Sequence, residues 1–153
     1  MPSFRSERRV RHGAKPMFEL VADIERYPEF VPLCKALRVR RRTTDEQGLE
    51  VLLADMEVGY RAIHERFTSR VTLDSAKLKI LVQYVDGPFS RLENVWNFRD
   101  EGPDSSLVEF FITYEFRSRI LAALMGSMFD AAFRKFSAAF EARADVIYGR
   151  KPG

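Results

Sequence analysis

Cysteine and histidine are nearly absent from this sequence. Cys34 is the single cysteine among 153 residues, and His12 and His64 are the two histidines. One cysteine excludes an internal disulfide and every metal site built from several cysteines. The two histidines stand far apart and form no His-x-x-x-His pair, which argues against a zinc site. We therefore expect no metal cofactor.

Nucleotide-binding and membrane-spanning patterns are missing as well. The sequence has no Gly-x-Gly-x-x-Gly motif and no glycine loop followed by a Walker lysine. No run reaches the roughly 18 apolar residues of a spanning helix. The charged N-terminal stretch has no apolar block behind it, unlike a secretory signal. Together with the lone cysteine, these absences predict a cytoplasmic protein.

The composition is that of an ordinary globular domain. Hydrophobic residues make up 46% of the chain and charged residues 31%, with a formal net charge of +3. A chain of this length suits one domain with a sizeable core. No repeat or shift in composition marks a boundary, so we expect residues 1–153 to form a single domain. The mildly basic charge is compatible with anionic lipid or RNA, but solvated surface charge is the simpler interpretation.

The longest helical pattern runs from Arg119 to Tyr148. Its apolar side chains cover about half of the helical cylinder, which is wider than the roughly 100° stripe of an ordinary surface helix. Such a helix must cover a large apolar surface that the preceding residues supply. The apolar arc contains Leu121, Leu124, Met125, Met128, Phe129, Ala132, Phe133, Phe136, Ala139 and Phe140.

Period-two alternation fills most of the chain before this helix. We predict a first strand over 3–11, a short helix that begins at Pro16, and a brief helix or rigid loop over Tyr27–Cys34. The short turns between the later strands imply an antiparallel meander. The prediction is an α+β fold in which a curved seven-stranded sheet closes around one C-terminal helix. The six later strands are expected over 35–43, 48–57, 60–73, 77–85, 92–100 and 106–117.

Few residues are suited to catalysis. Cys34 and His64 form a conceivable nucleophile and base, but a lone cysteine beside an apolar segment is more often a small packed residue. His64 and Glu65 are neighbours in a strand, so they point to opposite faces and cannot act as a pair. We therefore expect no enzymatic activity.

The densest charge lies in the predicted second strand, from Lys35 to Arg42. Arg38, Arg40 and Arg42 should share one face of that strand by alternation. One interpretation is a solvated face or an edge guarded against aggregation. The other is docking to phosphate, on a membrane surface or on ribosomal RNA rather than DNA. The aromatic residues typical of single-stranded nucleic-acid platforms are missing, which favours the first interpretation.

Apolar side chains exceed what a small core needs, with thirteen Phe and five Met. A curved sheet around a single helix tends to leave a gap. A dry gap of about 300 Å³, the low end for ligand sites, would cost about 7 kcal/mol at roughly 24 cal/mol per Å³. That cost is comparable with a domain's whole stability of about 5 to 15 kcal/mol. Either the gap is collapsed or something apolar occupies it.

Several motifs together resemble a known family. They are Tyr27-Pro-x-Phe-Val-Pro-x-Cys34, Val85-Asp-Gly-Pro-Phe89, Leu92 with Trp96-x-Phe98, and Phe110-x-Ile-x-Tyr-x-Phe116 before a Phe-rich helix. Their order over nearly the whole chain is similar to the START-like coenzyme Q-binding proteins, a group that includes ribosome-association toxins and relates more distantly to polyketide cyclases. The resemblance implies a helix-grip fold with a hydrophobic tunnel. It also implies binding of ubiquinone or another isoprenoid lipid in support of respiration.

On this basis the leading hypothesis is a non-catalytic quinone chaperone or carrier, cytoplasmic and in peripheral contact with the inner membrane. Tyr114 is a candidate hydrogen-bond partner for a quinone oxygen. The long helix carries Lys135 and Arg143 near its apolar arc, and we expect both to snorkel outward. The predicted ligand-binding residues are a lid of Tyr27, Phe30, Val31, Pro32 and Leu33, an opposite rim of Phe89, Leu92 and Trp96, and a lining of Phe110, Ile112, Tyr114, Met125, Met128, Phe129 and Phe133.

Two alternatives stay open. The first is a toxin-like protein that binds the large ribosomal subunit through Arg38, Arg40 and Arg42 and blocks subunit association. Leu33 bears on this choice, because coenzyme Q-binding members often carry Trp there while toxin-like members vary. The second alternative is a cyclase or aromatase, which would need an acid or base that faces the cavity.

Overall fold

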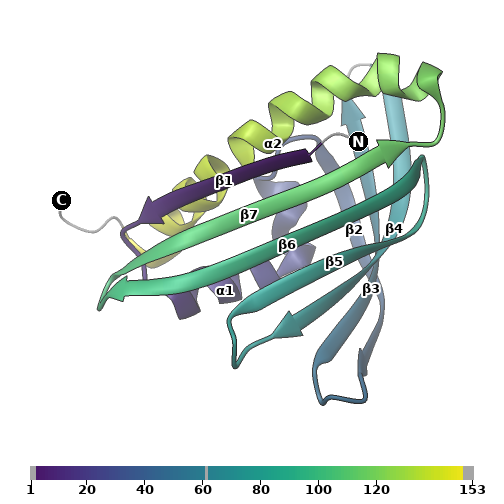
Figure 1. The fold of residues 1–153 in the computed structure, drawn as a ribbon. Coiled ribbons are helices and arrows are strands. Elements are labelled where there is room, and N and C mark those ends of the chain that lie inside the picture. The colour runs from purple at the N-terminus through teal and green to yellow at the C-terminus, as the bar shows by residue number, and fades with distance from the viewer. Residues whose placement is uncertain (1–2, 61, 150–153) are drawn as a thin grey trace.

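The structure, a computed structural model, describes residues 3–60 and 62–149 (Figure 1). One antiparallel sheet of seven strands has the order β1-β7-β6-β5-β4-β3-β2 and curves around the long helix α2. The predicted α+β helix-grip architecture is confirmed. The elements are β1 (Ser3–Val10), α1 (Ala14–Ala22), the 3-10 helix η1 (Ile24–Glu29), β2 (Cys34–Thr44), β3 (Glu50–Tyr60), β4 (Ile63–Asp74), β5 (Lys79–Asp86), β6 (Phe89–Gly102), β7 (Ser105–Phe116) and α2 (Arg119–Tyr148).

The sheet is the predicted meander from β2 to β7, with one addition. β1 pairs antiparallel with β7, from Ser3 opposite Thr113 to Val10 opposite Ser106. The first strand therefore joins the last, and α1 and η1 bridge from one edge of the sheet to the other. β2 forms the second edge, which fits the interpretation of its charges as an edge guard.

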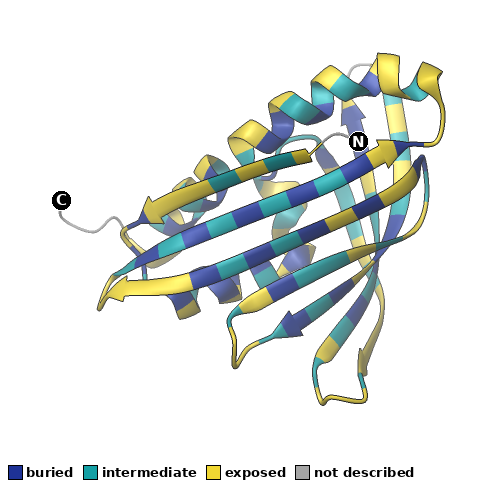
Figure 2. Cartoon of the chain, in the orientation of Figure 1, coloured by how far each residue is buried: buried dark blue, intermediate teal, exposed yellow. Residues whose placement is uncertain are grey.

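The long helix has the predicted bounds. Ser118 caps its N-terminus by accepting a hydrogen bond from the Leu121 backbone N–H at 3.1 Å. The first turns extend beyond the sheet, so Ile120 and Leu124 are 73% and 58% exposed (Figure 2). The predicted apolar arc is therefore wrong at Leu124. The buried residues of α2 are Met125, Phe129, Ala132, Phe133, Ser137, Phe140 and Ala144.

The first helix starts two residues earlier than predicted. Ala14 is its first residue, and the Ala14 backbone N–H donates to Asp100 Oδ1 at 2.9 Å. Pro16 is tolerated in this first turn because N–H groups there have no intrahelical partner. Ile24 belongs to η1, where Pro28 also lies. No helix among the described residues is long and apolar enough to cross a membrane.

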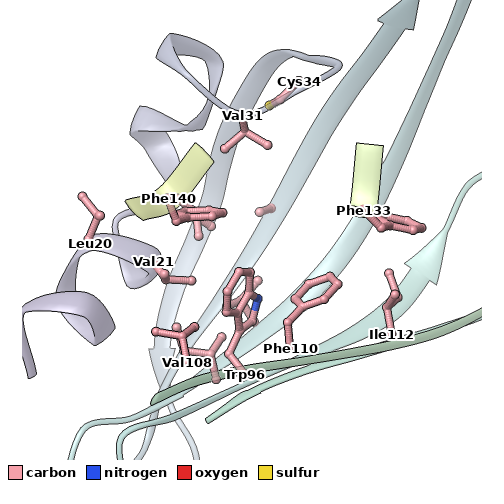
Figure 3. Packing of buried hydrophobic residues seen from close by; sticks show 14 of the residues in the cluster. Leu20, Val21, Val31, Cys34, Trp96, Val108, Phe110, Ile112, Phe133 and Phe140 are labelled. Atoms are coloured by element: carbon pink, nitrogen blue, oxygen red, sulfur yellow. The ribbon is translucent and has the colours of Figure 1, made fainter. Parts of the chain in front are cut away.

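The core lies between the inner face of the sheet and α2. On β7 every second residue from Val108 to Phe116 is buried, as the alternation predicts, and the same banding is visible along β6 (Figure 2). Trp96 makes edge-to-face contacts with Phe110, with ring centroids 4.7 Å apart, and with Phe140 at 5.1 Å (Figure 3). Aromatic contacts therefore join two central strands to the helix.

Candidate ligand cavity and basic surface

An apolar cavity of about 100 Å³ lies between the sheet and α2. The inner faces of β2 to β7 form its floor, α2 covers it, and η1 with the following loop closes one end. In Figure 3, Phe133 and Phe140 of α2 lie across from Trp96 and Ile112, with Val31 beside them. The lining residues are Ile24, Tyr27, Val31, Pro32, Leu33, Leu37, Ala54, Met56, Val58, Phe67, Ser69, Val71, Ile80, Val82, Phe89, Leu92, Asn94, Trp96, Ile112, Phe129, Ala132, Phe133, Phe136 and Phe140.

Tyr27 fastens the lid to the body of the protein. Its hydroxyl donates a hydrogen bond to the Val21 carbonyl oxygen at 2.5 Å. Its ring packs edge-on against Phe140 of α2 at 5.3 Å. Burial raises the pKa of the Tyr27 hydroxyl, so this group remains a donor at neutral pH. The side chain therefore holds η1 against both helices.

A second attachment of the lid runs through Phe30 and Arg143. The Phe30 ring lies edge-on to Phe140 at 5.1 Å, and the Arg143 guanidinium sits 5.1 Å from the Phe30 centroid. Arg143 also pairs with Glu29 at 2.5 Å and is only 20% exposed. The prediction that Arg143 snorkels outward is therefore wrong, because Glu29 gives it a partner at the lid. Lys135 is exposed, as expected.

The loop after η1 has an unusual backbone. Leu33 has φ = 68°, a left-handed conformation that costs a non-glycine residue roughly 1–2 kcal/mol. Its carbonyl oxygen accepts a hydrogen bond from the Gly59 N–H at 3.0 Å. A Cβ on Gly59 would meet His64 Nδ1 of β4 at 2.9 Å and Lys35 Cγ of β2 at 3.2 Å, so glycine leaves room for these two side chains. Leu33 thus lies on the cavity wall, where side-chain packing and the hydrogen bond from Gly59 hold its backbone conformation.

The structure brings most of the predicted site residues to one cavity. Those on its wall are Tyr27, Val31, Pro32, Leu33, Phe89, Leu92, Trp96, Ile112, Phe129 and Phe133. Whether they contact a ligand stays a prediction.

The other five predicted residues do not line the cavity. Phe110 packs among Trp96, Phe133 and Phe136, so other rings separate it from the cavity. Tyr114 lies among Phe89, Phe116 and Phe133, where burial and the charge of Asp130 raise the pKa of its hydroxyl. The remaining three are Phe30, which packs on the lid, Met125, which is buried on an earlier turn of α2, and Met128, which is half-buried beside the core.

The walls supplied by β2 to β5, together with Ser69 and Asn94, were not predicted from the sequence. Alternation in β3 and β4 could have identified Ala54, Met56 and Val71. Ser69 and Asn94 gave no such signal, because polar residues are expected to face solvent.

Cys34 is not an activated nucleophile. It is 6% exposed, and burial raises the pKa of its thiol to about 11, which keeps it protonated at neutral pH. His64 is exposed in β4. The part of the chain that the structure describes holds no group of three or more His, Cys, Asp or Glu side chains able to bind a metal ion.

A β-bulge in β2 redistributes the basic residues of that strand. Val39 lies opposite Ala54 and Arg41 opposite Leu53, so Arg40 is the extra residue. Arg42 therefore falls on the inner side of the sheet, where it pairs with Glu25 of η1 at 2.6 Å. The prediction that Arg38, Arg40 and Arg42 share one face is wrong, because one inserted residue reverses the alternation beyond it.

The outer face of the sheet gathers arginines from β2 and β4. Asp55 points outward, since Ala54 and Met56 line the cavity. Arg38 and Thr68 stand directly opposite Asp55, on the two neighbouring strands. Arg41 and Arg70 stand opposite Leu53 in the next outward row, and Arg66 stands opposite Glu57. We call Arg38, Arg40, Arg41, Arg66 and Arg70 the outer arginine face.

Asp55 neutralises only part of the positive charge of the outer arginine face. Arg40 Nε lies 2.9 Å from an Asp55 carboxylate oxygen, and the Thr68 hydroxyl donates to the other at 2.5 Å. The Thr68 hydrogen bond and the charges of Arg40 and Arg66 hold the pKa of Asp55 below its usual value, against the effect of partial burial. Arg38, Arg41 and Arg70 are exposed and form no ion pair with any described residue.

Comparison with known proteins agrees with this architecture of an antiparallel sheet around a long C-terminal helix. Residues 10–141 match the family described as polyketide cyclase / dehydrase and lipid transport. The chain belongs to this family. A solved structure of an 18 kDa protein from Caulobacter crescentus has 35% sequence identity and a TM-score of 0.78, over 97% of this chain and 99% of that one.

Two kinds of named relatives bear on the function of this family member. The ribosome association toxin RatA of Rickettsia prowazekii is 32% identical over 150 residues, which cover 96% of this chain and 99% of the toxin. The mitochondrial coenzyme Q-binding protein COQ10 homolog B of Xenopus laevis is 32% identical over 139 residues, 88% of this chain. The match spans about half of the Xenopus protein, 54% of its length. The predicted relationship to both groups is confirmed.

Proposed function

We propose that this family member is a non-catalytic protein that associates with ribosomes through its outer arginine face. The main support for this proposal is that Arg66 and Arg70 lie on β4, an interior strand of the sheet. Protection of a sheet edge against aggregation explains arginines on the edge strand β2, but it does not explain arginines on a strand that already pairs on both sides. Full-length similarity to ribosome association toxins supports this proposal over the quinone-carrier hypothesis.

The spacing of the outer arginine face suits a phosphate backbone. Outward residues recur about every 6.7 Å along a strand, and β2 and β4 flank β3, so their backbones lie roughly 10 Å apart. Two strands therefore present a two-dimensional array of guanidinium groups, each able to bind phosphate in a bidentate way. The face carries five arginines against the carboxylates of Asp55 and Glu57, so it retains net positive charge.

Sedimentation with purified ribosomal subunits tests this proposal. We expect wild-type protein to move with the large subunit at low salt and to dissociate steeply as salt increases, because each phosphate contact releases counterions. Subunit joining should decrease when the protein is present. Protein that stays at the top of the gradient at all salt concentrations would contradict the proposal.

A triple variant locates the surface. Changing Arg41, Arg66 and Arg70 to Gln should weaken binding more than tenfold and lower the log–log salt slope by about two to three. The matched control changes Arg42, Arg99 and Arg119 to Gln, which removes the same charge elsewhere. Equal weakening in both variants would mean that net charge, not this face, drives association.

A second candidate function is binding of an apolar ligand, for which the cavity is the specific observation. The resemblance and the Xenopus relative suggest an isoprenoid such as ubiquinone. The cavity volume of about 100 Å³ is below the roughly 300 Å³ of typical ligand sites. A ligand of that size therefore requires outward movement of the lid, and contact with the inner membrane stays a prediction of this candidate.

The cavity is small enough to remain empty at a modest cost in stability. An empty cavity of 100 Å³ costs about 2 kcal/mol at roughly 24 cal/mol per Å³, which a domain tolerates. Stability therefore does not require an occupant. Native mass spectrometry of protein mixed with ubiquinone tests uptake, and repeated recovery of empty protein would contradict this candidate.

The cavity offers no residue suited to acid–base catalysis. No Asp, Glu, His, Lys or Arg of the described chain lines it, and Tyr114 lies outside it. The Tyr27 hydroxyl is committed to Val21. We therefore infer a binding protein rather than a cyclase or aromatase. The proposed association with ribosomes is consistent with action in the cytoplasm.

A further inference from the structure

Two polar side chains lie on the otherwise apolar cavity wall. Ser69 of β4 is 7% exposed and Asn94 of β6 is 8% exposed, and both line the cavity. Their neighbours on the same inner faces are apolar: Phe67 and Val71 beside Ser69, and Leu92 and Trp96 beside Asn94. Polar side chains are uncommon at such inward positions, because burial of a hydroxyl or an amide costs free energy unless it is hydrogen-bonded.

The Ser69 hydroxyl has no hydrogen-bond partner among the described residues, although the residue is more than nine-tenths buried. Its oxygen is not sealed within packed atoms, as the Ser106 hydroxyl oxygen is, but borders the cavity. Thr68, the preceding residue, points outward, and its hydroxyl donates a hydrogen bond to Asp55. The inward hydroxyl of Ser69 is therefore free to bind a group inside the cavity.

One hydrogen bond of the Asn94 side chain is already made within the protein, and it orients the amide group. Its Nδ2 donates to the Phe111 carbonyl oxygen of β7 at 2.8 Å. An amide side chain offers two donor hydrogens and an acceptor oxygen, so this bond leaves one N–H and the carbonyl oxygen available. The bond to the neighbouring strand holds the amide in place beside the cavity.

We propose that Ser69 and Asn94 form the polar end of a ligand site and bind carbonyl or hydroxyl oxygens at the head of an otherwise apolar molecule. This inference rests on the second candidate function. A charged head group is excluded, because no charged side chain lines the cavity to neutralise it.

The positions of the two side chains restrict the head group further. Strands β4 and β6 are separated by β5, so the two backbones lie roughly 10 Å apart. Ser69 and Asn94 therefore contact different atoms of the ligand. A ring with oxygens on separate edges fits this arrangement better than a single terminal hydroxyl, and its tail would leave past the lid.

A pair of probes separates the polar contribution from the apolar one. Pentyl-1,4-benzoquinone and pentylbenzene share a ring and a tail but differ in the two carbonyl oxygens. Titration calorimetry should show that Ser69→Ala weakens binding of the quinone about three- to tenfold, the loss expected for one hydrogen bond. The affinity for pentylbenzene should stay unchanged or increase. Asn94→Leu should have the same selective effect.

Matched controls exist for both variants. Ser106 is fully buried in β7, lies off the cavity wall and has an unpaired hydroxyl, so Ser106→Ala should change neither affinity. Asn97 lies on β6 but points to the opposite face of the sheet, so Asn97→Leu controls for Asn94→Leu.

The outcomes distinguish the two levels of the proposal. If wild-type protein binds both probes and Ser69→Ala and Asn94→Leu leave the quinone affinity unchanged, the polar site is overturned while the apolar cavity site stands. If wild-type protein binds neither probe, the cavity is not a ligand site and both proposals are overturned.

Discussion

Cys34 shows how burial sets the chemistry of a single residue. Its raised thiol pKa means that the folded state favours the protonated form. That contribution to stability is fully present below the ordinary thiol pKa of 9.0 and is lost as pH rises toward about 11. We expect wild-type protein to lose more free energy of unfolding between pH 9 and pH 11 than Cys34→Ala does. Urea denaturation across this range measures the difference, and parallel curves would contradict it.

Tyr27 has a measurable role in stability through one hydrogen bond. Tyr27→Phe keeps the ring contact with Phe140 but leaves the Val21 carbonyl oxygen without its donor. We expect the free energy of unfolding to decrease by about 1–2 kcal/mol. Tyr148→Phe is the control, because its hydroxyl bonds to Pro16 at an exposed site and its loss should matter less. Equal effects of the two changes would argue against a fastening role for Tyr27.

At the scale of elements, the bulge in β2 decides which arginines face outward. Deletion of Arg40 should leave every pair of β2 and β3 in register, because Arg40 is the extra residue of the bulge between Val39 and Arg41. We expect a folded protein with somewhat weaker ribosome binding and a loss of about 1 kcal/mol from the ion pair with Asp55. Circular dichroism and sedimentation measure both effects.

Deletion of Val39 is the matched comparison. It removes a residue that pairs with Ala54 on the inner side and would draw Arg40 toward the core. We expect this deletion to lower the free energy of unfolding by several kcal/mol, as for a buried unpaired charge. If both deletions are tolerated equally, the bulge does not fix the register of β2.

At the scale of the whole molecule, the two candidate functions use opposite faces of one sheet. Ala54 points into the cavity, while its neighbour Asp55 belongs to the outer surface. Ala54→Leu should fill much of the 100 Å³ cavity and stabilise the protein by up to about 2 kcal/mol, the cost of the empty space. It should block uptake of ubiquinone and leave ribosome sedimentation unchanged.

This variant also tests whether the faces are independent. Thermal denaturation, native mass spectrometry and sedimentation of Ala54→Leu provide the three measurements. Loss of ribosome association in a stable Ala54→Leu protein would show that the cavity and the outer surface are coupled through the sheet.

The sequence by itself determined the elements and the inner face of the last strand. The bounds of α2 and the alternation from Val108 to Phe116 follow from local periodicity, since burial repeats every 3.6 residues in a helix and every two in a strand. The meander followed from short turns. The lid residues Val31 to Leu33 were found because proline-bounded apolar segments are conspicuous in sequence.

Only the tertiary structure decided the cavity volume, the pairing of β1 with β7 and the face of each arginine. A cavity is a small difference between the large volumes of the surrounding side chains, and periodicity reports burial without reporting the space left over. One extra residue at Arg40 reverses the faces of Arg41 and Arg42, which no alternation rule contains. Ser69 and Asn94 became candidates only when three-dimensional packing placed two polar side chains among apolar ones.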